Sequence, residues 1–497
     1  MTTSPYPILI ILVPLMTSFL IPLVGWWRRS LCYPLILAAL TVSAFSSLII
    51  LQMVMEQGTI HYHLGNWDPP WGIEYVFDHL NAFVAVIVSL TSLLIGISSK
   101  SLVERSFSKK AAFFYCLFLL QATGLLGIVV TGDAFNLYVF LEIASLAGYT
   151  LIAIGDDGAP FASFNYMLYG TVGACFYLLG VGYLYIVTGS LNMADLAKLL
   201  PPLYQSKPVL IAFAFFIVGV AIKMALFPLH VWLPDAYTYA PSAVSALIAP
   251  LTTKVGVYVA IRIMYTIFTP SFVKEFSSAT TLLSWVSIFA ILFGCIWALA
   301  QTDLKRMFAY VLVAEIGYLA LGIGLANRNG LTGTVLHIMN DTMMMASLFL
   351  VAGAVVTKTG FRRIDQWSGL HKKMPLTMAV FVVTALSVIG IPPMCGFFSK
   401  WYLLLGAINA KQWVAAAVLL GSSLVNAILF FRVIEVIYFR RPAEFPNQDR
   451  VQHEGFEEAP WSLLIPMLLF AAGIVSLGLL SGKIVSGIIQ FAIPEGL

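Results

Sequence analysis

Three lysines lie within long apolar segments, where an ionised side chain is costly. Lys223 and Lys254 each interrupt an apolar run long enough to cross a bilayer, and Lys400 lies near the end of another such run. A charged residue at the centre of a membrane helix costs at least ~2.5–3.5 kcal/mol, and such residues usually face a protein interior or a water-filled cavity. The three lysines therefore indicate a path for ions or protons inside the membrane.

We expect an acid and an imidazole to work with these lysines as a relay that passes protons along the middle of the membrane. Glu142 lies mid-segment in FNLYVFLEIASLAGY and is predicted to pair with Lys223. Lys254 is the predicted central carrier and Lys400 the exit. His337 suits the link between them, because its unperturbed pKa is near 6.5. Each residue could instead have a purely structural role, in a salt bridge or a packing contact.

Four further residues are possible members of the relay. Asp341 follows His337 by four residues, so the two share one helix face, and Glu315 lies in the apolar segment VLVAEIGYLALG. Either acid could instead be a polar contact between helices. His230 and Asp235 follow the Lys223 segment and could form a cytoplasmic proton entrance, although solvated loop residues would look the same.

The cysteines and the basic residues exclude other classes of site. The five cysteines are scattered singly, without the CxxC or Cys/His spacing that holds zinc or iron–sulfur clusters, so we expect no metal and no cofactor. The net charge of +4 comes from basic residues in loops, which does not indicate nucleic-acid binding. The cysteines are Cys32, Cys116, Cys175, Cys295 and Cys395.

Composition places these residues in an all-α polytopic membrane protein. The chain is 60% hydrophobic and only 10% charged, whereas soluble domains are about 25% charged. Because a spanning helix needs about 20 apolar residues, the hydropathy pattern predicts about fourteen spans. These cover roughly 7–25, 32–54, 79–98, 111–130, 134–154, 163–187, 208–229, 243–265, 280–300, 305–326, 331–357, 376–400, 412–438 and 461–481.

The segments between spans carry their own signals. Residues 54–77 are polar and aromatic and are expected to form a small hairpin at the membrane surface, while 191–200 reads as a short amphipathic helix. The tail 483–494 is expected to form a short surface helix. Arg432 and Glu435, three residues apart near a span end, predict a local ion pair.

Basic residues alternate between loops, which orients the chain. The richer side is assigned to the cytoplasm, so that both termini lie outside. We expect a multi-pass protein of a prokaryotic plasma membrane. The cytoplasmic set is Arg28, Arg29, Lys100, Arg105, Lys109, Lys110, Lys305, Arg306, Lys358, Arg362, Arg363, Lys372, Lys373, Arg440, Arg441 and Arg450, and the sparser outer set includes Arg262.

Prolines near the lysines predict broken helices, because proline removes a backbone donor. Pro228 follows Lys223, the pair Pro392–Pro393 precedes Lys400, and Pro250 precedes Lys254. The first two motifs lie five spans apart, and an odd offset is typical of an inverted repeat.

We therefore predict breaks in spans seven and twelve and two inverted five-helix repeats. The expected division is 1–110 for spans one to three, 111–266 for the first repeat and 280–440 for the second. Residues 441–497 hold a cytoplasmic loop, the last span and the tail. Two unrelated proline kinks would be the alternative.

Several of these segments together resemble the antiporter-like subunits of complex I and its relatives, over about residues 75 to 440. Within that superfamily LGNWDPPWGIEYVFDHLNAF, TGDAFNLYVFLE and TGSLNMADLAKL are most similar to the D subunit of Mrp-type multisubunit sodium/proton antiporters. The segments that carry the broader resemblance are FNLYVFLE, AIKMALFPLHVWLPDAY, PSAVSALIAPLTTKVGVYVAIR, QTDLKRMFAYVLVAEIGYLALG and IGIPPMCGFFSKW.

The resemblance implies a fourteen-span fold and the same glutamate–lysine pair, central lysine and terminal lysine. The family usually has His, His and Lys at four-residue spacing in the eleventh span. This sequence keeps the first histidine as His337 but has Asp341 and Met345 at the other two positions. Glu315 stands where a neutral polar residue is expected, and we expect it to substitute as a proton carrier.

The predicted function is that of a proton-translocating subunit in a Mrp-type multisubunit monovalent cation/proton antiporter. Its partners would be other membrane subunits, protons and sodium. The alternative is a proton-pumping subunit of a redox-driven complex I-like enzyme, such as a membrane-bound hydrogenase or an NADH dehydrogenase. In either case we expect no redox cofactor in this chain. A stand-alone secondary transporter is a further alternative, and a structural scaffold is disfavoured by the cost of the buried charges.

Overall fold

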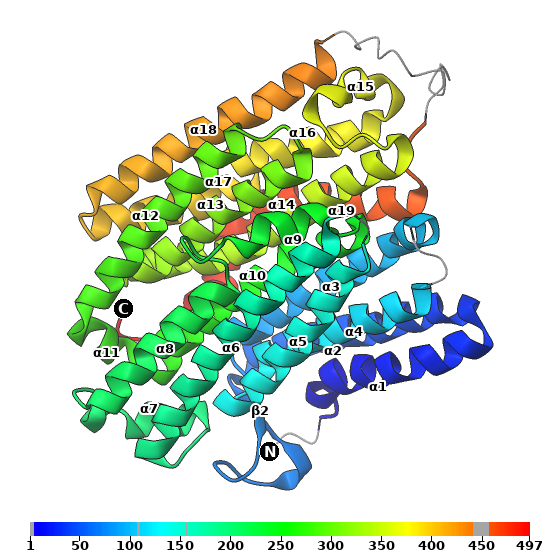
Figure 1. Cartoon of the computed structure of the whole chain (residues 1–497). Helices are drawn as coiled ribbons and strands as arrows, with labels where there is room; N and C mark the ends of the chain where they lie inside the picture. The colour runs from blue at the N-terminus through cyan, green and yellow to red at the C-terminus, as the bar shows by residue number, and fades with distance from the viewer. Residues whose placement is uncertain (1–3, 107–109, 156, 441–456) are drawn as a thin grey trace.

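The computed structural model describes residues 4–106, 110–155, 157–440 and 457–497 as an almost entirely helical protein (Figure 1). Within these residues, twelve helices are long and apolar enough to cross a membrane. They are α1 (Tyr6–Trp27), α2 (Cys32–Gln57), α3 (His79–Ser106), α4 (Ala111–Val130), α5 (Ala134–Ala153), α6 (Ala159–Thr188), α10 (Ser242–Arg262), α12 (Ser277–Leu299), α13 (Leu304–Gly324), α14 (Arg328–Thr359), α18 (Trp413–Tyr438) and α19 (Trp461–Ile484).

Two further crossings are interrupted. The seventh consists of α8 (Lys207–Lys223) and α9 (Trp232–Tyr239), and the twelfth of α16 (Pro375–Ile389) and α17 (Cys395–Asn409). Pro228 lies in the first gap and Pro392–Pro393 in the second, where the missing N–H donors prevent a continuous helix. With the twelve continuous helices they complete the predicted fourteen crossings and confirm the two predicted breaks.

Pro250 does not break its helix, contrary to expectation. α10 runs through Pro250 without interruption. The adjacent helix α14 packs against this part of α10, and its Thr342 hydroxyl contacts the Pro250 carbonyl at 3.2 Å. Proline removes one helical hydrogen bond, the one to the Ala246 carbonyl, and membrane helices tolerate that loss where neighbouring helices pack around them.

Short elements lie between the spans. The predicted hairpin is present as β1 (Ile60–His63) paired antiparallel with β2 (Glu74–Phe77), and the amphipathic helix as α7 (Met193–Leu199). Single turns precede α2 and follow β1, α7 and α14. The remaining elements are η1 (Arg29–Leu31), η2 (Leu64–Asn66), η4 (Pro201–Leu203), η6 (Ile364–Trp367), α11 (Thr269–Glu275) and α15 (Leu370–Lys373).

The predicted surface helix over 483–494 is wrong as a separate element. α19 continues through a π turn, η7 (Val485–Ile489), into α20 (Gln490–Ala492) without a break. Ile489 is fully buried, and the π turn contacts α3 and α14, so packing keeps this end helical. A second π turn, η5 (Ile263–Ile267), likewise extends α10.

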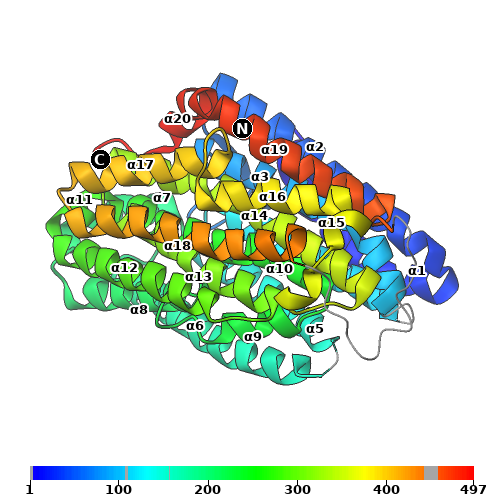
Figure 2. The ribbon, with the colours of Figure 1, turned by 90° about the horizontal axis from the view of Figure 1, so that it is seen from above.

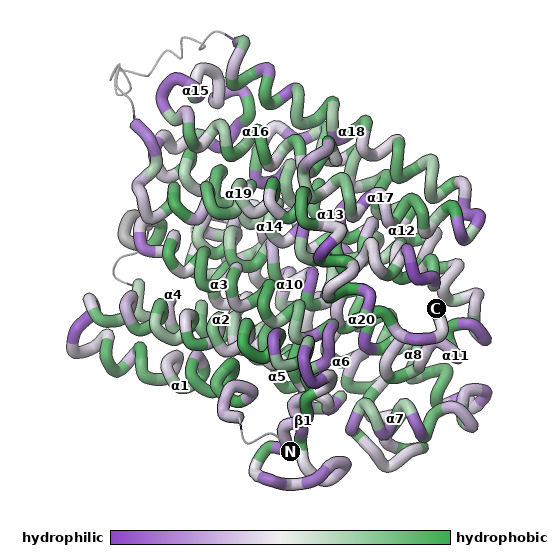
Figure 3. Tube along the Cα trace, turned by 180° about the vertical axis from the view of Figure 1, so that it is seen from behind, coloured by the Kyte–Doolittle hydropathy of each residue, from purple (hydrophilic) through white to green (hydrophobic). Residues whose placement is uncertain are grey.

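α10, α13 and α14 form the buried centre of the molecule. α14 contacts α10, α13, α16, α17 and α19, while α1 and α2 lie at one edge against α4 (Figures 1 and 2). Hydrophobic residues predominate along the helices, and hydrophilic segments gather at the hairpin, at α7 and near α15 (Figure 3). Part of the sequence predictions falls outside the described residues. This applies to three basic residues used to predict the orientation, Lys109, Arg441 and Arg450, and to residues 441–456 of the last predicted region.

Two backbone clips of identical pattern link helices that are far apart in sequence. In the first clip, Asp133 caps the start of α5 and pairs with Asn192 after α6. The Ala134 N–H donates to the Leu191 carbonyl, and the Met193 N–H donates to the Gly132 carbonyl. Asp303 caps the start of α13 and bridges Arg363 after α14. Its bonds run from Leu304 N–H to the Arg362 carbonyl and from Ile364 N–H to the Thr302 carbonyl.

These clips are the same in kind and occur five crossings apart. We propose that they mark corresponding positions in the two repeats 111–266 and 280–440. On this pairing α5 corresponds to α13, so that Glu142 and Glu315 lie on equivalent helices. The interrupted spans α8/α9 and α16/α17 then correspond as well.

Candidate functional site

The first charged pair joins α5 to the end of α8. Glu142 Oε1 lies 3.9 Å from Lys223 Nζ, and the lysine also donates to Ser145 Oγ at 2.8 Å and to the Tyr149 hydroxyl at 3.5 Å. Lys223 is the last residue of α8, where the negative end of the helix dipole favours a cation. The Trp232 indole N–H donates to the Ile222 carbonyl at 3.1 Å and so links α9 back across the break.

The second pair joins α10 to α14 at the centre of the molecule. Lys254 Nζ lies 2.6 Å from Asp341 Oδ2, and both side chains are almost completely buried. Lys254 also donates to the Ala249 carbonyl at 3.3 Å. Because an isolated buried charge is very unfavourable, this close carboxylate stabilises the ammonium form of the lysine.

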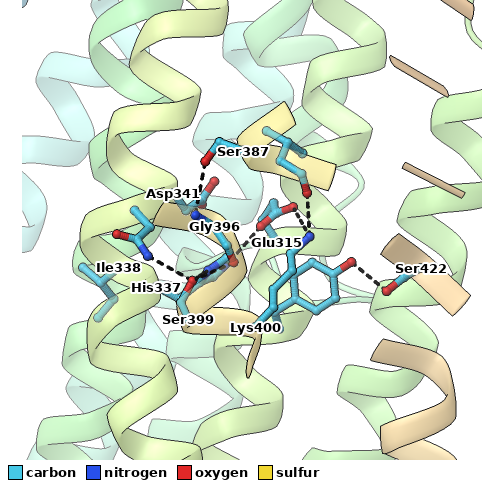
Figure 4. A network of polar contacts seen from close by, with 12 residues as sticks. Glu315, His337, Ile338, Asp341, Ser387, Gly396, Ser399, Lys400 and Ser422 are labelled. Atoms are coloured by element: carbon cyan, nitrogen blue, oxygen red, sulfur yellow. Dashed lines mark hydrogen bonds and ion pairs between the residues drawn. The ribbon is translucent and has the colours of Figure 1, made fainter. Parts of the chain in front are cut away.

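The third group joins α13, α14 and α17 (Figure 4). His337 Nε2 lies 2.7 Å from Glu315 Oε2, and Lys400 Nζ lies 3.8 Å from Glu315 Oε1. The other imidazole nitrogen is 2.9 Å from the Ser399 hydroxyl. Glu315 therefore stands between the imidazole and the terminal lysine.

Two neighbouring contacts orient Lys400. Its ammonium donates to the Val388 carbonyl at 2.6 Å, near the end of α16, and lies 4.6 Å from the ring centroid of Tyr318. The carbonyl lies at the break in the twelfth span, where backbone groups lack helical partners. The break thus supplies an oxygen ligand to the lysine.

The three groups together form a row that we call the lysine–acid row. The row contains three lysines and three carboxylates, so its formal charges balance. Each lysine has a carboxylate within 4.0 Å. Asp341 of the central pair and His337 of the third group lie one helical turn apart on α14. In order, the row is Glu142, Lys223, Lys254, Asp341, His337, Glu315 and Lys400.

A small cavity of about 30 Å³ lies between the first pair and the central helix. Lys223 and Ser145 line one side, and Thr252 and Gly256 of α10 line the other. Gln121 Nε2 donates to the Thr252 hydroxyl at 3.3 Å, which adds a polar group from α4. A volume of this size holds about one water molecule beside polar partners, so this part of the row has room for a bridging water.

The predicted relay residues are thus found together, although their partners differ in part from expectation. Lys223 has the predicted partner, Glu142. The two acids predicted only as possible members, Asp341 and Glu315, are the direct partners of the central and terminal lysines. Sequence spacing on one helix does not reveal which helix faces it, which is why these partners were not predicted.

His230 and Asp235 have different partners, and none of these partners belongs to the row. His230 is buried against Phe227 and Phe293, and its Nδ1 has no hydrogen-bond partner among the described residues. Asp235 forms a half-exposed ion pair with Arg306 at 3.2 Å. The contacts of neither residue connect it to Lys223.

Two basic residues assigned to loops are buried instead. Lys305 donates to the Ala240 carbonyl at 2.7 Å, between the ends of α9 and α10. Arg262 makes a two-point ion pair with Asp78, with contacts of 2.6 and 2.7 Å, and donates to the Tyr258 hydroxyl. The π turn that follows α10 places Arg262 inside the helical span, in agreement with the predicted span 243–265, whereas the count of basic residues by loop had placed it outside the membrane.

Arg432 and Glu435 do not form the predicted local pair. Arg432 instead donates to the Leu299 and Gln301 carbonyls at 2.9 and 3.2 Å, and Glu435 pairs with Arg440 at 3.3 Å. The end of α12 carries free carbonyls and the negative end of a helix dipole, which compete successfully for the guanidinium.

Known proteins are similar to this chain in sequence and in fold. Residues 131–425 match the family model described as NADH:quinone oxidoreductase/Mrp antiporter, transmembrane. An NADH-quinone oxidoreductase subunit N from Desulforudis audaxviator is 45% identical, with 99% of each chain covered. The D subunit of a Na(+)/H(+) antiporter from Bacillus subtilis is 28% identical, with 94% of each chain covered.

Two solved membrane complexes contain chains of closely similar fold. A chain of the membrane-bound sulfane sulfur reductase, an archaeal respiratory membrane complex, superposes with a TM-score of 0.89 at 29% identity, covering 98% of this chain and 97% of that one. A chain of the Mrp complex from Dietzia sp. DQ12-45-1b gives 0.87 at 26% identity, covering 99% and 97%.

Proposed function

The chain belongs to the NADH:quinone oxidoreductase/Mrp antiporter transmembrane family, and from that premise we propose that it is a proton-translocating subunit of a redox-driven, complex I-like membrane assembly. It is an antiporter-like membrane subunit of that superfamily. The observation that carries the proton-translocating role is the lysine–acid row, in which every lysine has a carboxylate partner at membrane depth.

The first step that we propose takes place at Glu142 and Lys223. An ionised Glu142 stabilises the charged lysine, and a proton arriving at the carboxylate removes that stabilisation. Lys223 then releases its proton towards α10 through the cavity lined by Thr252. The separation of 3.9 Å between the pair is wide enough for the lysine to change partners.

The central step is a transfer within the pair of Lys254 and Asp341. A proton moves from Nζ to Oδ2 across 2.6 Å, which converts two charged groups into two neutral ones without changing the net charge. Asp341 then passes the proton to His337, one helical turn away, and His337 passes it to Glu315 across 2.7 Å. Lys400 first releases its own proton at the exit and is then reprotonated by Glu315. Lys254, left neutral by the central transfer, takes up the proton that Lys223 released, so each member of the row returns to its starting state.

Replacing Glu142 by glutamine is expected to reduce proton translocation at least ~10-fold, since an amide neither holds the lysine charge nor exchanges a proton. Proton uptake into proteoliposomes that contain the purified complex measures this. Glu56→Gln, which changes an exposed carboxylate at the end of α2, is the matched control. Transport at the wild-type rate in Glu142→Gln would contradict a role for the first pair.

Restoring the family's lysine tests the departure in the eleventh span. Met345 is fully buried one turn beyond Asp341, so in Met345→Lys a second cation would compete with Lys254 for one carboxylate. We expect translocation to fall at least ~10-fold, whereas Met345→Leu, which conserves volume, should be tolerated. Faster transport in Met345→Lys would show that Glu315 has not taken over the task.

The redox-driven assembly is supported by the 45% identical subunit N and by the respiratory sulfane sulfur reductase fold. A Mrp-type cation/proton antiporter is the second candidate, supported by the similarity to the antiporter D subunit and to the Mrp complex. In both cases we propose other membrane subunits as partners. Sodium would be a transported ion only in the second.

Isolation of the native complex through a tag on this chain separates the two candidates. A redox-driven complex should show the absorbance of flavin or iron–sulfur clusters bound to co-purifying subunits. It should also move protons when a reductant is added. Loss of that proton movement with an uncoupler is the control. A complex without these chromophores that moves protons in response to a sodium gradient would favour the antiporter instead.

A further inference from the structure

A cleft rich in arginine is lined by none of the residues of the lysine–acid row. Its volume is about 180 Å³, and it lies where α12 is followed by α13, beside the segment after α14 and the end of α18. We call it the arginine cleft. The polar residues that line it are Gln301, Thr302, Arg363, Asp365, Arg432 and Arg440.

The charges of the arginine cleft do not balance. Three guanidiniums line it with one carboxylate, Asp365, among the described residues. Arg363 is paired to Asp365 by contacts of 3.1 and 3.0 Å, and Arg440 to Glu435 on the outside at 3.3 Å. Arg432 has no carboxylate within ion-pair distance in the described part of the chain and contacts backbone carbonyls there instead.

Arg432 also has an unused donor. Both of its Nη groups are bonded to carbonyls at the end of α12, but Nε is buried without a hydrogen-bond partner among the described residues. A buried guanidinium N–H without an acceptor is unfavourable, and phosphate oxygens suit the fork geometry of arginine. The cleft therefore presents both charge and donors to a phosphate group.

The surroundings of the arginine cleft fit a lipid better than a free ion. Large apolar side chains are exposed on the two helices that end at the cleft: Ile296 on α12, Phe431 on α18, and Phe439 directly after α18. The two helices contact each other. Arg363 and Arg440 belong to the basic loops assigned to the cytoplasmic face, where basic pockets between membrane helices bind anionic headgroups.

We propose that the arginine cleft binds the phosphate of an anionic phospholipid, whose acyl chains lie along the exposed faces of α12 and α18. The bound headgroup would link three segments of the second predicted repeat. These are the α12–α13 connection, the clip at Arg363 and the end of α18. The site is separate from the proton row, so it stands or falls independently of the proposed function.

Native mass spectrometry of the full-length chain, purified in detergent, tests the proposal directly. Phosphatidylglycerol and phosphatidylcholine are titrated against wild type, Arg432→Gln and Arg440→Gln. We expect wild type to retain phosphatidylglycerol preferentially, and each substitution to weaken retention about fivefold, the effect of removing one charge at a membrane surface. Arg28→Gln and Arg29→Gln, which remove exposed charges between α1 and α2, should leave retention unchanged.

Inorganic phosphate forms the second arm of the experiment. If it displaces phosphatidylglycerol at equal concentration, the site recognises a free phosphate and the lipid proposal is wrong. Equal retention of phosphatidylcholine, or unchanged retention in both cleft variants, would also overturn it. Arg440 is exposed, so Arg440→Gln remains informative if Arg432→Gln fails to fold.

Discussion

Lys254→Ala is expected to lower proton translocation by at least ~100-fold while the complex still assembles. Lys254 is the lysine of the row that joins the two predicted repeats, and alanine can neither hold a proton nor balance Asp341. The rate of proton uptake by proteoliposomes containing the variant complex measures the loss. Lys100→Ala, which removes an exposed lysine near the end of α3, should transport normally.

A paired variant separates lost chemistry from lost stability. Removing one partner of a buried ion pair costs ~3–5 kcal/mol, whereas replacing both by apolar residues of similar volume is often neutral. Lys254→Met combined with Asp341→Leu should therefore regain thermal stability relative to Lys254→Ala and remain inactive. Recovery of transport in the double variant would mean that the central pair has a structural role only.

Glu315→Gln is expected to reduce translocation by at least ~100-fold as well, because this carboxylate contacts both His337 and Lys400. The amide cannot carry a proton between them. The buried lysine also loses its carboxylate partner, so a modest fall in melting temperature should accompany the loss. Both quantities are measured on the same purified complex.

Glu315→Asp provides the comparison for that variant. It keeps a titratable carboxylate, so partial activity is expected even though the shorter side chain lengthens its contacts. Glu56→Gln again controls for removal of a carboxylate elsewhere. If Glu315→Gln pumped at the wild-type rate, protons would have to reach Lys400 by a route that avoids the third group.

The sequence was sufficient to predict the fold class, the interrupted spans and the members of the row. Long apolar runs report spans directly because the hydrocarbon core has a fixed thickness. Charged residues within such runs are rare enough to indicate a site without further information. That is why Lys223, Lys254 and Glu142 could be singled out before any helix was placed.

The partners within the row depend on how helices rotate against one another, which hydropathy does not report. Asp341 faces Lys254 on another helix, and Glu315 reaches across to α14 and α17. Local packing also decided two wrong predictions. α10 continues through Pro250 where a break was expected. The tail continues α19 instead of forming a separate surface helix, because Ile489 is buried.

A cryo-EM map of the native complex, at a resolution that shows ordered water, would decide whether protons can move sideways along the row. Lateral transfer requires water between Lys223 and Lys254, in the cavity lined by Thr252, together with continuous polar contacts from Asp341 to Lys400. We expect the map to show both. Dry apolar packing between the two lysines, or lysine side chains turned towards lipid, would contradict lateral proton transfer.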